Sequence, residues 1–479
     1  MNYRMIFRIL GLTLLLFSAL LLLPAVAALC FGEAVLPFLL TAAISAAVAG
    51  LFLLIRPKTR AIYAREGFVA VSLTWIFMSL IGALPFLFSG EIPRYIDALF
   101  ETVSGFTTTG ATILTDVEAM SHGCLFWRSF THWIGGLGVL VFVMAVLPMS
   151  GDYSMHIMKA EVPGPVVGKL VPRAKDTARI LYIMYAVMTL AETILLLCGG
   201  MSFFDALLHA FGTAGTGGFS TRNASVGAYG SAYIEMVIAV FLVLFGINFN
   251  LYYLMLIGRI REALKSEELH CYLLIIALAT VAIALGISVS CGGIGQGFRT
   301  AFFTVASIIS TAGFSTADFT SWPGYTLVIL LALMFIGGCA GSTGGGLKVS
   351  RVMILSRDAR ADIARMVSPK RVRAVRMDGR CVEESVTGTV CSFFFLYMLI
   401  ILVCTFLVSF DGFDFLTGFT AAVTCISNVG PGLSAQIGPS GNFAAFSALS
   451  KIVMTLTMLF GRLEIYPMLI LAGRLFRKR

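Results

Sequence analysis

Long apolar runs separated by short polar connections recur along the whole chain. A bilayer core about 30 Å thick requires roughly 20 apolar residues in a spanning helix. Ten runs reach that length, and they lie near residues 9–31, 34–55, 68–90, 125–149, 178–199, 231–257, 270–291, 325–355, 387–410 and 443–475. The first run is too long for the apolar core of a signal peptide, so we expect it to remain as a helix. The pattern predicts an all-α polytopic membrane protein with ten transmembrane helices.

Four connections carry a second pattern, a short apolar segment followed by a stretch of Gly, Ser and Thr. The four segments read DALFETVSGFTTTGAT from Asp97, DALLHAFGTAGTGGFST from Asp205, TAFFTVASIISTAGFST from Thr300 and TGFTAAVTCISNVGPGLS from Thr417. A glycine stands thirteen residues after each opening Asp or Thr, at Gly110, Gly218, Gly313 and Gly430. These segments are too short to span a bilayer. Their spacing of about 100 residues indicates an internal fourfold repeat.

Each repeat therefore reads as a full helix, a half helix, a glycine-rich loop and a second full helix. The opening Asp or Thr is predicted to cap the half helix. Bare peptide groups survive at membrane depth only where protein or water surrounds them, so four such loops on one axis would line a pore with carbonyl oxygens. For any single loop the alternative is close helix packing, but four copies at matched spacing favour the pore. In the second copy the glycine could also be Gly217.

The repeat divides the chain into an N-terminal pair of helices and four pore-loop units. The expected boundaries are 1–66 for the helix pair, then 67–150, 151–265, 266–384 and 385–479 for the four units.

Composition and charge support a membrane location. Hydrophobic residues make up 58% of the chain and charged residues 12%, with a mean hydropathy of +0.93, which excludes a soluble enzyme, a disordered chain and a secreted disulfide scaffold. Of the 34 Lys and Arg residues, 28 lie in one alternate set of connections. This bias predicts that both termini are cytoplasmic, and the net charge of +9 then requires no nucleic acid.

The charge of the transported ion follows from the half helices. They enter from the outside, so their C-terminal ends, each carrying about half a negative charge, point toward the centre and favour a cation. The loops contain neither a carboxylate ring, which divalent-ion sites usually use, nor a Lys or Arg. A monovalent cation such as K⁺ is therefore the expected cargo.

The motifs SGFTTTGAT, GGFST, STAGF and SNVGPG resemble the filter segments of the Trk/Ktr/HKT superfamily of potassium transporters. The two extra N-terminal helices resemble its TrkH type rather than the shorter KtrB type. This resemblance implies a potassium filter with four strands. The implied filter residues are Thr107, Thr108, Thr109, Gly110, Gly215, Thr216, Gly217, Gly218, Ser310, Thr311, Ala312, Gly313, Ser427, Asn428, Val429 and Gly430. In related plant transporters a serine at the first filter glycine accompanies sodium, so Gly110 favours potassium.

Two features of the eighth and tenth spans match an intramembrane gate in the same superfamily. GGCAGSTGGGLKV, from Gly337 to Val349, should break its helix, and the resemblance makes it a gating loop. The implied gate residues are Gly341, Gly344, Gly345, Gly346, Lys348 and Arg462. Arg462 would repel cations below the filter. The alternatives are a tight helix crossing for the loop, an ion pair of Arg462 with Glu464 or another neighbour, and a snorkelling Lys348.

The resemblance also implies partners and a location. The basic segment from Lys348 to Glu384 would dock a cytosolic nucleotide-binding ring of the TrkA type, and the chain would form a homodimer in the bacterial inner membrane. The chain has no nucleotide motif of its own, since GCAGSTGGGLK lacks the ending of a Walker loop. Transport would be driven by the membrane potential, as a channel or a symporter.

Two other classes of function remain as alternatives. A secondary carrier of a small solute, coupled to sodium or protons, would usually show two inverted repeats and ionisable residues at mid-span. A membrane enzyme would need a catalytic constellation. The chain has no HExxH motif, and its five histidines, His122, His132, His156, His209 and His270, do not cluster in sequence. We therefore expect no catalytic residues, and a structural role for His209.

Overall fold

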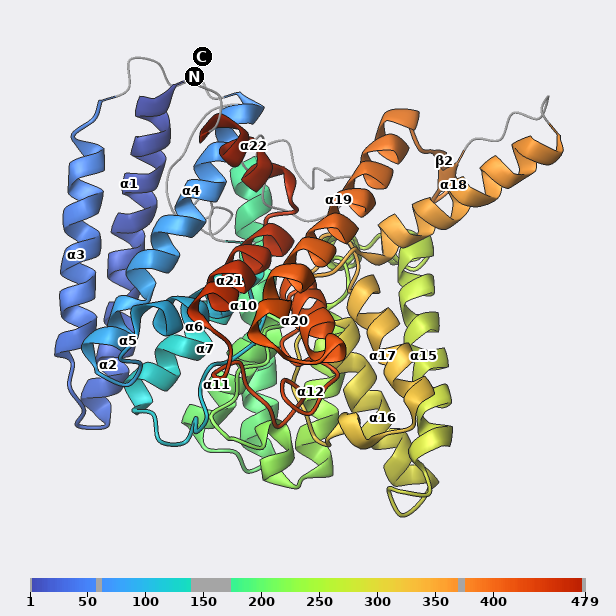
Figure 1. Cartoon of the computed structure of the whole chain (residues 1–479), viewed down its shortest axis with the longest axis horizontal. Coiled ribbons are helices and arrows are strands. Elements are labelled where there is room, and N and C mark those ends of the chain that lie inside the picture. Colours follow the sequence, from blue (N-terminus) through green and yellow to red (C-terminus); the bar gives the residue numbers. More distant parts are fainter. Residues whose placement is uncertain (1, 57–62, 139–173, 369–374, 476–479) are drawn as a thin grey trace.

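The computed structural model describes residues 2–56, 63–138, 174–368 and 375–475. Helices dominate this part of the chain (Figure 1). Its strands are β1 (Arg376–Met377) and β2 (Arg380–Cys381), which pair antiparallel. The start of α1 (Tyr3–Leu20) and helix α22 (Tyr466–Leu475) lie at the same face of the molecule. We call this the terminal face.

Six helical stretches are long and apolar enough to cross a membrane. They are Tyr3–Cys30, which joins α1 to α2 (Leu22–Cys30), α3 (Leu36–Leu53), Arg65–Phe88, which joins α4 (Ala64–Gly82) to α5 (Leu84–Phe88), α10 (Ala174–Cys198), α15 (Glu267–Ile287) and α19 (Glu384–Val408). All six coincide with predicted spans. Helix α1 packs against α3 and α4, so the N-terminal pair is attached to the first repeat.

The other four predicted spans are not continuous straight helices in the described residues. Helices α12 (Ala232–Phe245) and α13 (Phe249–Leu256) meet at 89°, and α21 (Ala448–Arg462) and α22 meet at 119°. A loop from Gly337 to Lys348 separates α17 (Gly324–Ile336) from α18 (Val349–Val367). Helix α7 (His122–Gly136) covers the start of the span predicted at 125–149, and the rest of that span lies outside the described residues.

The four half helices are present, and those of the last three repeats each precede a broken span. They are α6 (Tyr95–Phe106), α11 (Phe203–Ala214), α16 (Ile294–Ile309) and α20 (Phe415–Ser427). Short elements complete the connections. These are α14 (Ile260–Ala263) and the 3-10 helices η1 (Ser225–Tyr229), η2 (Phe319–Ser321) and η3 (Ser409–Asp411).

The predicted caps of the half helices are wrong. The N-cap residues are Arg94, Ser202, Gly293 and Asp414, in chain order. Asp97 and Asp205 lie instead in the first turn of α6 and α11, where a carboxylate also complements the positive end of the helix dipole. At α11 the cap is Ser202, whose hydroxyl accepts from the backbone N–H of Asp205 at 3.0 Å.

The half helices and the second helices of the repeats form a closed ring. Helix α11 packs against α7, α16 against α12, α20 against α17, and α6 against α21. Each half helix thus contacts the second helix of the preceding repeat, and the first contacts that of the last. The ring places the four loops that follow the half helices on a common axis.

Candidate functional site

The four segments that follow the half helices share one backbone conformation. Two residues before each glycine, Thr108, Thr216, Thr311 and Asn428 have φ between 53° and 64°. Gly110, Gly218, Gly313 and Gly430 have φ of 78°, 79°, 81° and 100°. Gly217 is not among the residues with positive φ. Gly218 is therefore the structural equivalent of the other three glycines.

The glycines interlock around the axis. A Cβ atom on Gly110 would lie 1.9 Å from the carbonyl oxygen of Gly217, and one on Gly218 would lie 1.9 Å from that of Ala312. The same construction gives 2.2 Å from Gly313 to Val429 and 2.7 Å from Gly430 to Thr109. Each glycine thus abuts the carbonyl that precedes the glycine of the next repeat, and the fourth repeat returns to the first. A side chain at any of these positions would push the ring apart.

The backbone N–H groups of the segments turn toward their own half helices. The residue before each glycine donates to a carbonyl of the last turn of the half helix, as Thr109 does to Ser104 at 2.9 Å and Ala312 to Ser307 at 2.9 Å. Gly217 and Val429 donate in the same way to Gly212 and Thr424. The hydrogen bonds seen in the described residues leave the carbonyl oxygens that abut the next glycine unused. These oxygens are therefore available to a ligand on the axis.

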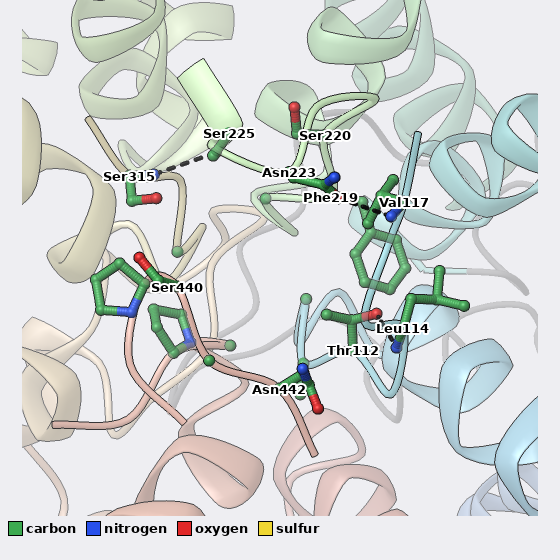
Figure 2. A pocket seen from close by; sticks show the side chains of 18 of the residues that line it. Thr112, Leu114, Val117, Phe219, Ser220, Asn223, Ser225, Ser315, Ser440 and Asn442 are labelled. Carbon is green, nitrogen blue, oxygen red and sulfur yellow. Dashed lines mark hydrogen bonds between the residues drawn. The ribbon is translucent and has the colours of Figure 1, made fainter. Parts of the chain in front are cut away.

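All four glycines line one pocket, together with hydroxyl and amide side chains (Figure 2). Asn223 and Ser225 of the second repeat bind neighbouring repeats there. Asn223 accepts from the N–H of Val117 at 2.7 Å, and Ser225 accepts from the N–H of Ser315 at 3.3 Å. The pocket lining contains no carboxylate, but it includes the side chains of Arg128 and Arg222.

A buried ion pair supports the first segment. The Nε atom of Arg128 on α7 lies 2.6 Å from the carboxylate of Glu101 on α6, and both side chains are almost completely buried. Glu101 also accepts from the hydroxyl of Thr112 at 2.9 Å and the N–H of Ile113 at 3.0 Å. Arg128 donates to the carbonyl oxygen of Ser220 at 3.0 Å. The pair therefore holds the chain just beyond Gly110 and Gly218.

His209 has the structural role that the sequence indicated. Its Nδ1 lies 2.8 Å from the carbonyl oxygen of Asp205, and its Nε2 lies 2.9 Å from the hydroxyl of Ser220. Both partners belong to the second repeat. Within the described residues, no group of three or more His, Cys, Asp and Glu side chains is arranged to hold a metal ion.

The loop from Gly337 to Lys348 lies directly against the third and fourth segments. Gly345 donates its N–H to the hydroxyl of Thr311 at 2.6 Å. A Cβ atom on Gly345 would lie 2.2 Å from the carbonyl oxygen of Ser427, and one on Gly344 would lie 2.8 Å from that of Ser310. Gly341 and Gly346 both have positive φ. The loop glycines thus combine unusual backbone conformation with close approach to the ring.

Both ends of this loop are attached to neighbouring helices. Glu268 on α15 accepts from the N–H of Ala340 at 2.7 Å and from that of Ser350 at 3.1 Å. Lys348 is buried and donates its ammonium group to the carbonyl oxygen of Gly344. A buried Lys348 is incompatible with the alternative of a side chain that snorkels to the surface.

Arg462 ends α21 and bridges three parts of the chain. It donates to the carbonyl oxygen of Thr343 in the loop at 2.8 Å and to those of Gly135, at 2.5 Å, and Gly136 on α7. Glu464, one of the partners considered from the sequence, is instead bound by Arg351, with Nη1 to Oε1 at 3.1 Å. Arg462 is therefore held by backbone carbonyls between the loop and the first repeat.

Sequence reasoning missed two side-chain contacts that support the segments, one within the first repeat and one between the fourth repeat and the first. The Arg128–Glu101 pair had a usable signal, since both are ionisable residues inside apolar segments. Asn428 had none, although its amide donates to the hydroxyl of Thr109 at 2.9 Å and so joins the fourth segment to the first. That contact joins residues separated by 319 positions.

Comparisons with known proteins identify relatives over the whole chain. A sequence model of the TrkH family, described as a cation transport protein, matches residues 37–477. The Trk system potassium uptake protein TrkH of Salmonella typhimurium is 37% identical over 479 residues and covers 98% of each chain. The Trk system potassium uptake protein TrkG of Escherichia coli is 37% identical over 420 residues, covering 86% of this chain and 85% of TrkG. The crystal structure of the potassium transporter TrkH from Vibrio parahaemolyticus matches with a TM-score of 0.89 and 34% identity over all of both chains. The chain therefore belongs to the TrkH family of cation transport proteins.

Proposed function

We propose that this chain takes up potassium across a membrane through the four glycine segments. The carrying observation is the closed ring, in which each glycine abuts the carbonyl oxygen before the next glycine. Rings of backbone carbonyls can replace the hydration shell of K⁺. The C-terminal ends of four half helices add negative potential where the ion loses its water. The relatives named as potassium uptake proteins support the choice of ion.

The residues proposed for the filter are the sixteen that the resemblance implied, four in each segment. Free carbonyl oxygens and the absence of a carboxylate in the pocket lining support this assignment. The proposed order of units is an N-terminal helix pair followed by four pore-loop repeats, with the boundaries expected from the sequence.

The proposed gate is the loop between α17 and α18 together with Arg462. Its support is position, because Gly344 and Gly345 contact the third and fourth segments and Arg462 binds Thr343. A fixed positive charge beside the ion path raises the energy of a cation there. Displacement of the loop would break the hydrogen bond between Gly345 and Thr311 and move Arg462. In this proposal Lys348, bound to Gly344, helps to hold the loop closed.

The proposed orientation places the terminal face in the cytoplasm of a bacterium and the pocket of Figure 2 outside. The bias of Lys and Arg along the chain supports it. Potassium would then enter with the membrane potential, which supplies about 2.3 kcal/mol per charge for each 100 mV. The basic segment from Lys348 to Glu384 is the proposed docking site of a TrkA-type cytosolic ring, and the chain is proposed to act as a homodimer.

Growth and flux together test this function. A bacterium that lacks its potassium uptake systems is grown at low potassium with the intact chain or an empty vector, and purified protein is assayed for rubidium and sodium flux in proteoliposomes. We expect rescue of growth and a rubidium flux that exceeds the sodium flux. Uptake of a sugar or amino acid without rubidium flux would overturn the proposal and favour a secondary carrier.

A further inference from the structure

The second segment differs from the other three because two extra glycines accompany Gly218. The residues equivalent to Gly215 and Gly217 are Thr107 and Thr109 in the first segment, Ser310 and Ala312 in the third, and Ser427 and Val429 in the fourth. Neither Gly215 nor Gly217 has a positive φ. The backbone conformation therefore does not require glycine at these two positions.

The reason for the extra glycines is His132 on α7. A Cβ atom on Gly217 would lie 2.2 to 2.4 Å from three atoms of the His132 ring, and one on Gly215 would lie 2.3 Å from the carbonyl oxygen of the same residue. At both positions the three nearest atoms all belong to His132. The second segment thus has no side chain at the two positions that lie against His132.

His132 is fully buried. Its ring stacks on Phe219 with centroids 4.1 Å apart and planes at 17°. Arg128, one turn earlier on α7, lies 3.5 Å from the centroid of the same Phe219 ring. Neither ring nitrogen of His132 has a hydrogen-bond partner among the described residues. The contact with the second segment is therefore made by the shape of the ring.

Gly217 transmits this contact to the ring of carbonyl oxygens, because its own carbonyl is the one that abuts Gly110. We propose that His132 is a specificity-determining positioning residue, whose ring fixes Gly217 and thereby the distance at which the second segment presents its carbonyl oxygens to the cation. This inference rests on the proposed potassium function. It adds to that function a side chain outside the ion path that sets the preference between alkali cations.

The physical basis is close packing. Protein interiors transmit small displacements because they contain few voids, and replacing the ring by a methyl group leaves a cavity into which Gly217 can relax. Selectivity among alkali cations depends on the spacing and stiffness of the coordinating oxygens. A looser second segment is expected to accept sodium more readily while the other three segments keep their contacts.

The test compares three variants in proteoliposomes, His132→Ala, Gly217→Ala and the double variant. For His132→Ala we expect the ratio of rubidium to sodium flux to fall roughly three- to tenfold. Gly217→Ala places its methyl group on the ring and should lose most of its rubidium flux. The double variant removes the clash and should recover a substantial part of that flux. Recovery by a second mutation is a result that general destabilisation would not produce.

Two controls separate this inference from the proposed function. Leu10→Ala removes a buried side chain of α1, and it should keep the wild-type flux ratio even where it lowers the yield of protein. His132→Gln retains a planar side chain and covers the case in which His132→Ala does not fold, and its flux ratio should lie between those of wild type and His132→Ala. If the intact chain does not prefer rubidium, the proposed function fails. If it does, and the His132 variants keep the wild-type ratio or Gly217→Ala is not relieved by His132→Ala, this inference alone is overturned.

Discussion

At the scale of single residues, the site depends on glycines, which have no Cβ atom. A Cβ atom on any of the four filter glycines would lie too close to a neighbouring carbonyl oxygen. That distance is 2.7 Å for Gly430 and 1.9 Å for Gly110 and Gly218. Each glycine also has a positive φ, which costs a residue with a side chain about 1–2 kcal/mol. A substitution therefore costs free energy both through its backbone conformation and through the clash with the carbonyl, and the severity of the clash differs among the four repeats.

Gly110→Ser is the sharpest test of the clash between a side chain and the neighbouring carbonyl. We expect it to relax the preference for potassium over sodium, because the serine Cβ would displace the carbonyl of Gly217. Gly430→Ser should disturb selectivity less, since its neighbour lies farther away. The measurement is the ratio of rubidium to sodium flux in proteoliposomes. Gly90→Ser is the control, because Gly90 has the same φ of +78° as Gly110 but no atom within 4 Å of its missing side chain. An unchanged sodium permeability in Gly110→Ser would contradict the filter assignment.

The buried Arg128–Glu101 pair leads to a second prediction. Arg128→Met leaves Glu101 buried without its cation, which typically costs about 3–5 kcal/mol, so the melting temperature in detergent should fall clearly. Glu101→Gln combined with Arg128→Met removes both charges and should be less destabilised than Arg128→Met alone. Arg94→Met, at the exposed N-cap of α6, serves as the control for loss of one arginine. Equal melting temperatures for Arg128→Met and Arg94→Met would show that the pair adds nothing to stability.

Spacing along each half helix indicated Gly110, Gly313 and Gly430 and left Gly217 or Gly218 in the second repeat, where the positive φ belongs to Gly218. The sequence was insufficient for the contacts of Arg128 with Ser220 and of Asn428 with Thr109, which join different repeats. Local pattern reports which residues share an element, whereas a contact across repeats depends on how the helices close into a ring. The misplaced caps at Asp97 and Asp205 have a related cause, since a carboxylate is favourable both at the N-cap and in the first turn.

At the scale of elements, the second helix of a repeat is where the chain departs from a simple span. Apolar runs predicted continuous helices at 231–257 and 443–475, but the chain bends by 89° and 119° there. Hydropathy measures transfer into lipid and contains no information on the path of the backbone. The loop from Gly337 to Lys348 was predictable because its glycines are dense. The bend after Arg462 contains two residues with positive φ, Glu464 and Ile465, and the hydropathy pattern singles out neither of them.

Arg462 gives the prediction that belongs to this scale. If it closes the path by its charge, Arg462→Ala should raise basal rubidium flux roughly tenfold, equivalent to about 1.4 kcal/mol off the barrier. Arg462→Lys keeps the charge but cannot reach Thr343, Gly135 and Gly136 in the same geometry. Flux close to wild type in the lysine variant would indicate a charge barrier, and flux close to that of the alanine variant would indicate a clamp on the loop. Unchanged or lower basal flux in Arg462→Ala would exclude the barrier.

At the scale of the whole molecule, one covalent chain builds a ring whose last unit must meet its first. The fourth repeat reaches the first through the contact of α21 with α6, through the N–H of Phe443, which donates to Thr112 at 2.8 Å, and through Asn428. An ion pair completes this seam between the fourth repeat and the first. The Nζ atom of Lys451 on α21 lies 2.7 Å from the carboxylate of Asp97 on α6. These contacts, together with those of Arg462 to Gly135 and Gly136, join repeats that are not adjacent in sequence, so closure is the step that depends least on local pattern.

The seam can be tested by a double-mutant cycle on Lys451 and Asp97. Their side chains are 6% and 18% exposed, so the pair is less screened than a surface pair, and we expect a coupling of about 1–2 kcal/mol. The variants Asp97→Asn, Lys451→Met and their combination are melted in detergent, and the coupling is the part of the double effect that the single effects do not explain. Arg259 and Glu262 form the control pair, because they are more than half exposed and three residues apart. Their coupling should not exceed about 0.5 kcal/mol. If the Asp97–Lys451 coupling were as small as that of the control, the ring would be closed by packing and by hydrogen bonds such as those of Phe443 and Asn428, and the two charges would have no part in joining the fourth repeat to the first.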